Sequence, residues 1–476
     1  MVREMKKIFL NILFVFAFSV LPAISPFYLT MADWSASSLE NTAVCTASGQ
    51  QSFPQIVSDK AGGAIIVWED TRNVHFDIYA QRIDAQGNVL WMGNGIPVCT
   101  APENQNKLRI ISDGEGGVII TWQDIRRGSG NYDIYAQRID KEGKPRWAEN
   151  GVAVCTEVNA QNSPCIATDA SGGAVVIWQD LRTNYADLYA QRISKDGEML
   201  WAIDGVLICG TSGAQSAPVA VDDGAGGVIV VWQDFRRSYA DIYAQRVDGS
   251  GKILWDKNGV AVCTASGHES FPVIISNKAE GAVIAWVDTR NGNNDVFSQQ
   301  LDGNGSIHWK ENGVAVSIAK GNQNYPVITS DGAGGAYIAW SDMRSGESDI
   351  YIQRIDIAGN ALWIEDGWGI CTETGIQNYV NIDNDGAGGV SLVWNDSHKS
   401  TFFDVYAQWI DQKGQLRWGD KGLAVSMAPD TQCYPVIAND GIGSAVISWQ
   451  DARNKDTSYW DIYAQKVNEK DSLGQR

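Results

Sequence analysis

Short apolar stretches recur along the chain, each bounded by turn-forming glycine and aspartate. The first, Ala64–Trp68, is continuously apolar, which is the pattern of a strand covered on both faces. It leads into a Trp-x-Asp motif that recurs eight times, at intervals of 54 to 56 residues. The motif tryptophans are Trp68, Trp122, Trp178, Trp232, Trp286, Trp340, Trp394 and Trp449. Such regular spacing predicts one structural unit repeated eight times.

Each repeat contains the pattern of four strands. In the first repeat these are expected over Phe53–Ser58, Ala64–Glu69, Asp77–Asp84 and Val89–Cys99, the last interrupted near Gly93–Gly95. Turns with aspartate and glycine separate them and favour hairpins, because glycine adopts positive φ without strain. Eight four-stranded antiparallel units predict an all-β fold, a single eight-bladed β-propeller.

The last repeat ends after Asp461–Val467 and lacks the sequence of its fourth strand. That sequence stands before the first repeat, as Trp34 and Ala43–Thr46. We therefore predict that the N-terminal strand completes the last blade and closes the ring, since an open array would need polar caps. The propeller is expected over residues 33–468, followed by a short polar tail at 469–476.

Residues 1–32 have the pattern of a signal peptide. Positive charges precede the apolar Ile8–Ile24, and small residues allow cleavage after Ala32. The alternative is an uncleaved membrane anchor, because Ile8–Ala32 is long enough to span a bilayer. Pro22 and Pro26 favour cleavage. We expect an exported protein, in the periplasm, at the cell surface or outside the cell, with no membrane span in the mature chain.

Composition and charge narrow the classes of partner. The 19 tryptophans and 49 glycines suit an all-β protein with many turns. The net charge of −19 argues against nucleic acid, whose phosphates would be repelled. Neutral sugars, bound cations and extracellular proteins remain compatible with it. We expect a monomer.

The cysteines follow the repeat. Six of them occupy one repeat position, which Ser317 and Ser426 fill in the two remaining repeats. Equivalent points on neighbouring blades lie too far apart for disulfides, so free buried thiols are predicted. Cys165 and Cys433 fall at other positions, and the sequence assigns them no role.

Two family resemblances support this fold. Trp68–Arg72 and Asp77–Arg82 resemble the repeats of sialidase-type, BNR-like proteins. That resemblance implies a propeller and, as one alternative function, a sialidase-like glycoside hydrolase. Asp140–Trp147 is similar to the tryptophan-docking repeat of quinoprotein propellers, which implies an oxidoreductase with a coloured cofactor as a further alternative.

One polar position precedes the inner strand of every repeat and is a candidate ligand-binding ring at the channel mouth. It is occupied by Gln51, Gln105, Gln161, Gln215, Glu269, Gln323, Gln377 and Gln432. Amides both donate and accept hydrogen bonds, as sugar hydroxyls require. The alternative is that each side chain caps the backbone of its own loop, because residues repeated in every blade are usually structural.

A second ring consists of the Asp and Arg of Trp-x-Asp-x-Arg together with an aspartate that follows the loop. In the first three repeats these are Asp70, Arg72, Asp77, Asp124, Arg126, Asp133, Asp180, Arg182 and Asp187. Their oxygens could bind calcium. The favoured interpretation is a structural Asp–Arg–Asp clasp, because arginine pairs with carboxylates in bidentate geometry.

The loops between these charges carry aromatic residues, which are candidates for contact with ligands. They include Phe76, Tyr132, Tyr185, Tyr239, Phe403 and Trp460. Aromatic faces stack on sugars or anchor protein partners, although they also pack onto the blade below. The sequence thus predicts a non-enzymatic, exported binding or scaffolding propeller for glycans or cell-surface partners, with no required cofactor other than a candidate calcium ion.

Overall fold

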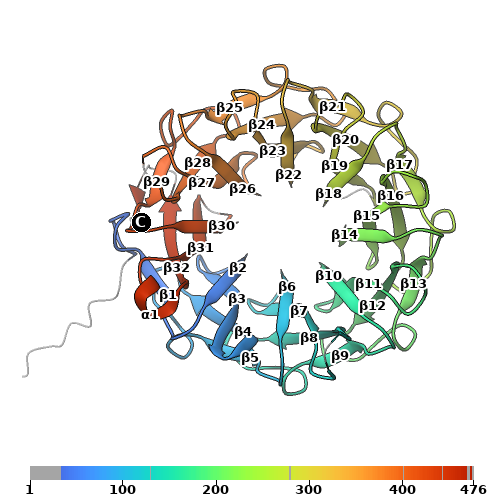
Figure 1. Cartoon of the computed structure of the whole chain (residues 1–476), viewed down its shortest axis with the longest axis horizontal. Helices are drawn as coiled ribbons and strands as arrows, with labels where there is room; N and C mark the ends of the chain where they lie inside the picture. The colour runs from blue at the N-terminus through green and yellow to red at the C-terminus, as the bar shows by residue number, and fades with distance from the viewer. Residues whose placement is uncertain are drawn as a thin grey trace, which may run out of the picture. The chain divides into compact units, whose positions relative to one another are not determined.

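The computed structural model describes residues 34–128, 130–277, 280–399, 401–441, 443–468 and 472–473. The predicted signal segment and most of the polar tail lie outside these residues. Eight antiparallel sheets surround a central channel (Figure 1), so the predicted fold class, an eight-bladed β-propeller, is confirmed. We number the blades from 1 to 8 in the order of their inner strands.

Blades 1 to 7 each contain four strands in sequence order from the channel outwards, whereas in blade 8 the outer strand comes from the N-terminal part of the chain. The inner strands are β2 (Gln51–Ser58), β6 (Gln105–Ser112), β10 (Gln161–Thr168), β14 (Gln215–Asp222), β18 (Glu269–Ser276), β22 (Gln323–Ser330), β26 (Gln377–Asn384) and β30 (Gln432–Asn439). The second strands are β3 (Ala64–Asn73), β7 (Val118–Asp124), β11 (Ala174–Asp180), β15 (Val228–Asp234), β19 (Ala282–Asp288), β23 (Ala336–Asp342), β27 (Val390–Asp396) and β31 (Ser444–Asp451).

The third and outer strands complete the blades. The third strands are β4 (His75–Ile83), β8 (Asp133–Ile139), β12 (Asp187–Ile193), β16 (Asp241–Val247), β20 (Asp295–Leu301), β24 (Asp349–Ile355), β28 (Asp404–Ile410) and β32 (Asp461–Asn468). The outer strands are β5 (Ile96–Cys99), β9 (Val152–Cys155), β13 (Val206–Cys209), β17 (Val260–Cys263), β21 (Val314–Ser317), β25 (Trp368–Cys371), β29 (Leu423–Ser426) and, in blade 8, β1 (Thr42–Cys45). A short helix α1 (Lys455–Ser458) and a short strand β33 (Ser472–Leu473) belong to blade 8.

The fourth strand of each repeat is shorter than the sequence predicts. In blade 1 the expected stretch from Val89 yields a single bridge, Ile83 with Val89, and then a turn before β5. The turn brings Gly95 under the motif tryptophan: a Cβ there would lie 2.5 Å from the ring of Trp68. The close approach of the indole, together with a φ of +87°, explains why glycine occupies this position. The same turn explains why β5 begins only at Ile96.

Two series of tryptophans pack between blades: those of the Trp-x-Asp motif and a second series, such as Trp147, that precedes the outer strands. The Trp-x-Asp tryptophans are fully buried, and Trp68 lies in one apolar cluster with Val44 and Ile462 of blade 8. Tryptophans of the second series cross to the next blade: the indole N–H of Trp147 donates to the carbonyl of Lys195 at 3.0 Å. Burial of such large side chains at every blade boundary supplies much of the apolar stabilisation of the ring.

The N-terminal strand β1 belongs to blade 8. It pairs antiparallel with β32, with Thr42 opposite Ala464 and Cys45 opposite Ile462. Trp34 takes the place of the second tryptophan series at this boundary, because its indole N–H donates to the carbonyl of Ala85 in blade 1 at 3.1 Å. That this pairing holds the ring together stays a prediction, which a deletion can test.

Among the described residues, no helix has the length and apolar character needed to cross a membrane.

Candidate functional site

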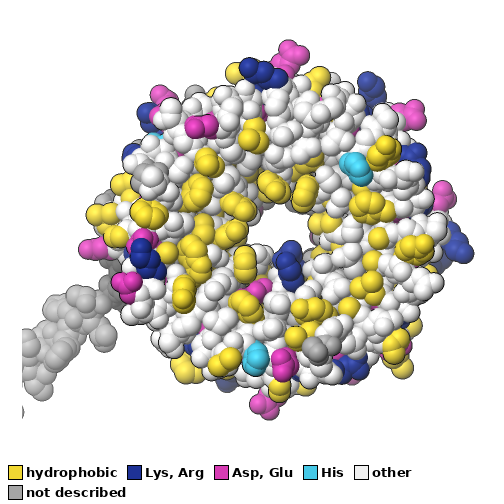
Figure 2. Space-filling model, in the orientation of Figure 1, with side chains coloured by type: hydrophobic (Ala, Val, Ile, Leu, Met, Phe, Trp, Pro, Cys, Tyr) yellow, Lys and Arg dark blue, Asp and Glu magenta, His cyan; other side chains and the backbone are white. Residues whose placement is uncertain are grey.

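The central channel forms a hollow with a volume of about 750 Å³. All eight inner strands contribute side chains to its lining. Hydrophobic side chains gather around its opening on the face shown in Figure 2. The channel is therefore the place where side chains from every blade can contact one ligand.

A bulge near the start of each inner strand turns one residue into the channel mouth. In blade 1 the pairing of β2 with β3 shifts register between Ser52 and Gln55. The third residue of every inner strand has a positive φ, between 48° and 56°. These residues are Phe53, Lys107, Ser163, Ala217, Phe271, Tyr325, Tyr379 and Tyr434. Left-handed backbone at a non-glycine residue costs about 1–3 kcal/mol, and such strain is typical of functional sites.

In blades 1, 2 and 3 the preceding blade holds the bulge in place. The backbone N–H of Phe53 donates to the side-chain oxygen of Gln450 at 3.1 Å. The same contact joins Ser163 to Gln123, also at 3.1 Å. Both glutamines are the middle residue of a Trp-x-Asp motif. The motif therefore tethers the channel-facing bulge of the following blade.

Five of the eight bulge residues are aromatic, and they come from the adjacent blades 5, 6, 7, 8 and 1. We call Phe271, Tyr325, Tyr379, Tyr434 and Phe53 the aromatic arc. Ring centroids are 4.7 Å apart between Tyr379 and Tyr434 and 5.2 Å apart between Phe271 and Tyr325. Tyr325 remains 57% exposed. The arc thus presents aromatic rings around more than half of the mouth, with a gap between Tyr325 and Tyr379.

A smaller hollow opens inside the arc. It has a volume of about 160 Å³ and lies between Tyr325 and Tyr379. Asn324, Ser341 and Asn378 add polar groups to its lining. The buried hydroxyl of Ser341 makes no hydrogen bond within the described structure. An aromatic wall next to an unpaired hydroxyl is the combination that binds a polar, ring-shaped ligand.

One tyrosine of the arc, Tyr434, has a raised pKa. Hydrogen bonding to Tyr379 and burial raise the pKa of Tyr434 to about 12. The phenol of Tyr434 therefore keeps its proton at neutral pH, where it can donate a hydrogen bond but cannot act as an ionised nucleophile or base.

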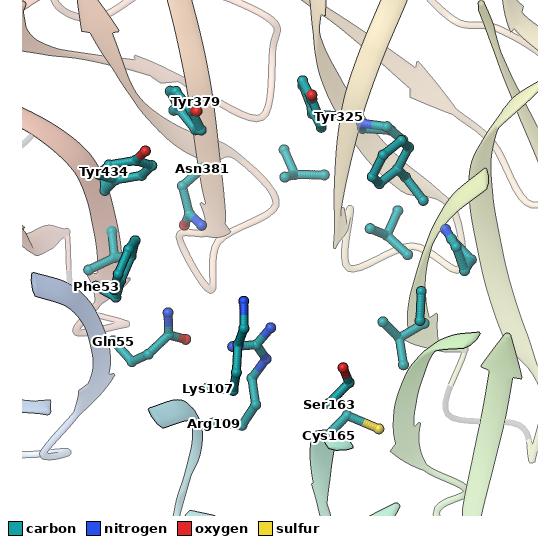
Figure 3. Close-up of a pocket in the computed structure, with 18 of the residues that line it drawn as sticks. Phe53, Gln55, Lys107, Arg109, Ser163, Cys165, Tyr325, Tyr379, Asn381 and Tyr434 are labelled. Atoms are coloured by element: carbon teal, nitrogen blue, oxygen red, sulfur yellow. The ribbon is translucent and has the colours of Figure 1, made fainter. Parts of the chain in front are cut away.

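Blade 2 differs from the others, since its inner strand carries two basic residues at the channel. Lys107 occupies the bulge position, and Arg109 follows two residues later. Figure 3 shows both side chains extending into the channel, opposite Tyr325 and Tyr379. The buried Glu69 accepts the backbone N–H of Lys107 at 2.7 Å, and burial raises the pKa of this carboxyl group to about 7.

The predicted glutamine ring lies beside the channel, inside the protein. All eight side chains at this position are fully buried. The amide of Gln105 donates to three carbonyls of its own loop, including that of Glu103 at 2.9 Å. The amide of Gln432 contacts its loop in the same way. These hydrogen bonds match the loop-capping alternative, and no exposed surface of these side chains faces a ligand.

Glu269 breaks this pattern in blade 5. A carboxylate cannot donate to the loop carbonyls, and both oxygens of Glu269 are buried without a hydrogen-bond partner. Burial, followed by the nearby Asp288 and Asp241, raises the pKa of Glu269 to about 9. Cys263, Glu269 and Asp288 lie close enough to share a metal ion, but the guanidinium of Arg290 already contacts Cys263 and Asp288. Arginine therefore supplies the positive charge in this cluster.

The Asp and Arg of each Trp-x-Asp-x-Arg motif form a bidentate pair. Asp70 accepts from Arg72 at 3.0 and 2.6 Å, and the indole N–H of Trp68 donates to the same carboxylate. The guanidinium lies 3.8 Å above the ring of Tyr79 and also contacts Cys45 of the preceding blade at 3.1 Å. Asp124 with Arg126 and Asp180 with Arg182 repeat this pair. The motif thus links adjacent blades.

The sequence predicted that the second aspartate of each repeat pairs with the motif arginine, but the structure shows a different partner. Its carboxylate binds a residue of the intervening loop. Asp77 accepts from Asn73, Asp133 from Arg127, and Asp187 from Thr183, all at 2.6 to 2.8 Å. These short bonds fix the loop shape. A calcium ion at these oxygens stays a prediction.

The loop aromatics divide into two groups. Tyr185 and Tyr239 are exposed, at 53% and 55%. The other four are half-buried: Phe76, Tyr132, Phe403 and Trp460. Three of these four also anchor backbone, because the carbonyls of Tyr132, Phe403 and Trp460 accept the N–H of the glutamine in the next blade. None of the six lines the channel.

All eight cysteines are free and buried, so the predicted thiols are confirmed. Burial raises the pKa of Cys45 and Cys99 to about 12. Cys165 lines the channel two residues beyond its bulge, at the place that Arg109 takes in blade 2. Cys433 is a buried residue of β30. A protonated, buried thiol reacts slowly, so these cysteines are structural.

Sequence reasoning missed the channel-facing residues. A sequence pattern could have found them. The position of Phe53, directly before a frequent proline, varies between repeats from alanine to tyrosine, while the position of Gln51 is nearly constant. Variation inside a constant frame is typical of positions that face a ligand or solvent. The positive φ that points these residues into the channel has no counterpart in the sequence rules, since Phe and Tyr rarely adopt it.

Comparisons with known proteins support no more than the architecture. No protein-family model and no curated protein match the chain. An ulvan lyase from a new family of polysaccharide lyases aligns over 90% of this chain and 96% of its own, with 10% identity and a TM-score of 0.49. The α-L-arabinanase of Penicillium chrysogenum aligns over 66% and 94%, with 11% identity and a TM-score of 0.36. A puromycin-hydrolysing peptidase of Mycobacterium tuberculosis aligns over 88% and 61%, with 12% identity and a TM-score of 0.45. These similarities are too low to indicate a function.

Proposed function

We propose that this chain is an exported, non-enzymatic glycan-binding propeller whose binding site is the channel mouth. The observation that carries the proposal is the aromatic arc: five rings from adjacent blades, placed at the mouth by strained bulges. Strain at one position in every blade is maintained only where the surrounding structure enforces it, and here it serves to present side chains.

The chemistry of the arc suits sugar rings. Aromatic faces stack against the C–H groups of a pyranose, and tyrosine hydroxyls donate to its oxygens. The hollow between Tyr325 and Tyr379 adds the unpaired hydroxyl of Ser341. Because the rings follow the curve of the mouth, an extended oligosaccharide could contact several at once and gain affinity through multivalency.

The lining of the channel favours binding over hydrolysis. A glycoside hydrolase generally requires two carboxyl groups beside the scissile bond. The described residues that line the channel include no aspartate, glutamate or histidine. The sialidase-like alternative would also need converging arginines, whereas Arg72, Arg126 and Arg182 each pair with an aspartate of their own blade. No observation here favours the hydrolase or the quinoprotein alternative.

The free cysteines are compatible with an exported glycan-binding protein. An exported chain meets oxidising conditions and polymeric glycans, and its thiols must resist unwanted disulfide formation. Burial and raised pKa values give the cysteines that resistance, as at Cys45 and Cys209. The periplasmic, cell-surface or extracellular location stays a prediction that rests on the signal-peptide pattern of residues 1–32.

Replacement of tyrosines in the arc tests the proposal. A glycan array with the mature chain, followed by calorimetry on the best soluble oligosaccharide, should show saturable binding. Tyr325→Ala and Tyr379→Ala should each weaken binding about tenfold or more, because each removes a stacking surface worth about 1–2 kcal/mol. Tyr239→Ala, an exposed loop tyrosine outside the channel, is the control and should bind as the parent does.

The same samples test the alternatives. Binding lost on removal of calcium would assign the aspartate ring to a cation. Turnover of a chromogenic glycoside would support the hydrolase, and visible absorbance of the purified protein would support the quinoprotein. If Tyr239→Ala weakens binding and the arc variants do not, the site lies on the loops and the channel proposal is wrong.

A further inference from the structure

The two basic side chains at the channel mouth indicate which glycans the site selects. We infer that the site prefers anionic saccharides, with Lys107 and Arg109 binding a carboxylate or sulfate group while the aromatic arc stacks on the sugar rings. This inference rests on the proposed function and adds the charge of the ligand to it.

Arg109 differs from the other arginines by making no ion pair with an acidic side chain, and its charge interacts with the buried Glu69 only at longer range. Every other arginine in the described part of the chain makes an ion pair with an aspartate or glutamate, from Arg72 with Asp70 to Arg453 with Asp451. Within the described part of the chain, the side chain of Arg109 makes one hydrogen bond, to the carbonyl of Leu108 at 2.9 Å. In a protein with a net charge of −19, an exposed guanidinium without a carboxylate is available to an anion from outside.

Lys107 is also without a carboxylate partner for its ammonium group among the described residues. The nearby Glu69 is buried, and its carboxyl group accepts the backbone N–H of Lys107 rather than the side chain. Glu69 therefore fixes the bulge and leaves the ammonium group facing the channel. Both basic groups are exposed, which keeps them accessible to a ligand.

The basic pair breaks the eightfold pattern. The other seven bulge residues are uncharged, and so are the seven residues equivalent to Arg109, among them Gln55, Cys165 and Asn381. A structural role would be repeated in every blade, as the Asp–Arg pairs are. Figure 3 shows that Gln55 and Asn381 also line the channel, which adds amide groups to the lining.

Opposite sides of the mouth thus have complementary chemistry. Arginine binds planar carboxylates and tetrahedral sulfates through two N–H groups, and lysine adds a point charge. The aromatic arc on the other side binds the apolar faces of the sugars. A linear polysaccharide that carries regularly spaced acid groups would engage both sides.

Calorimetry with three oligosaccharides of equal length tests this inference. The probes are a galacturonic acid hexamer, the neutral galactose hexamer that corresponds to it, and a sulfated galactose hexamer. We expect at least one acidic hexamer to bind about tenfold or more tightly than the neutral one at 50 mM NaCl, and this preference to shrink at 500 mM NaCl because of screening. The acidic hexamer that binds more tightly identifies the anion as carboxylate or sulfate.

Variants assign the preference to the two residues. Lys107→Gln combined with Arg109→Gln should abolish the preference, so that the acidic and neutral hexamers bind about equally. The control, Lys310→Gln with Arg417→Gln, removes the same charge from exposed positions that do not line the channel and should keep the preference. A folded Lys107/Arg109 variant that retains the preference would overturn the inference, as would equal binding of all three hexamers by the parent.

The two proposals fail in different ways. Equal binding of acidic and neutral hexamers, lost in Tyr325→Ala, would leave the glycan-binding function intact and remove only its selectivity for anions. No binding of any hexamer or of any glycan on the array would contradict the proposed function itself.

Discussion

Deletion of Trp34–Thr46 is expected to lower the free energy of unfolding by more than about 5 kcal/mol, because it removes the outer strand of blade 8. The segment buries Trp34, Val44 and Cys45 almost completely. It also pairs with β32 and places the indole N–H of Trp34 on the carbonyl of Ala85. The deletion would therefore open the boundary between blades 8 and 1 and expose a strand edge that promotes aggregation.

Thermal and denaturant unfolding measure this effect. The control is a chain that begins at residue 33, which should unfold like the parent. A synthetic peptide with the sequence Trp34–Thr46, added in excess to the shortened chain, should restore part of the lost stability by mass action. An unchanged melting temperature after deletion would show that the ring closes without this strand.

Glu269→Gln is expected to stabilise the protein by about 2–4 kcal/mol at pH 8 and by less than about 1 kcal/mol at pH 5. The native environment raises the pKa of Glu269 to about 9, mainly through burial and then through Asp288 and Asp241. The folded protein therefore keeps this proton, whereas the unfolded chain releases it above about pH 4.5. The contribution of Glu269 to the free energy of unfolding is therefore fully present below about pH 4.5. It falls by up to about 1.4 kcal/mol per pH unit as the pH rises towards 9.

Glutamine removes this dependence because it is neutral and can donate to the loop carbonyls, as Gln105 does in blade 2. Denaturant unfolding of both proteins from pH 5 to pH 9 measures the difference. Gln215→Glu provides the reverse control in blade 4 and should introduce a similar loss of stability at high pH. Parallel stability curves for the parent and Glu269→Gln would contradict the raised pKa.

Both predictions concern places where the repeat is broken: the junction of the chain ends, and one acid in a ring of amides. The basic pair of blade 2 is a third such place. In a molecule made of similar blades, positions shared by all eight stabilise the ring, as Arg72 does by binding Asp70 and Cys45 together. Function is expected where blades differ, and the channel mouth shows the clearest differences among the described surfaces.

The sequence by itself determined the number of blades, the four strands of each and the tryptophans between them. These features depend on local patterns: apolar stretches such as Ala64–Trp68 bury both faces, and turns such as Asp84–Gly87 reverse the chain. The sequence also indicated which strand completes blade 8, since Ala43–Thr46 supplies what the last repeat lacks. Each inference needed only the regular chemistry of one repeat.

Only the tertiary structure decided which residues face the channel. Strict alternation along the inner strand would not distinguish Gln51 from Phe53, yet Gln51 is fully buried and Phe53 is 46% exposed. The bulge that contains Phe53 lies between Ser52 and Gln55, and the N–H of Phe53 donates to Gln450, a residue 397 positions away that the ring brings alongside. Contacts of this kind come from residues far away in the sequence, and for that reason the channel surface could not be predicted from the pattern of one repeat.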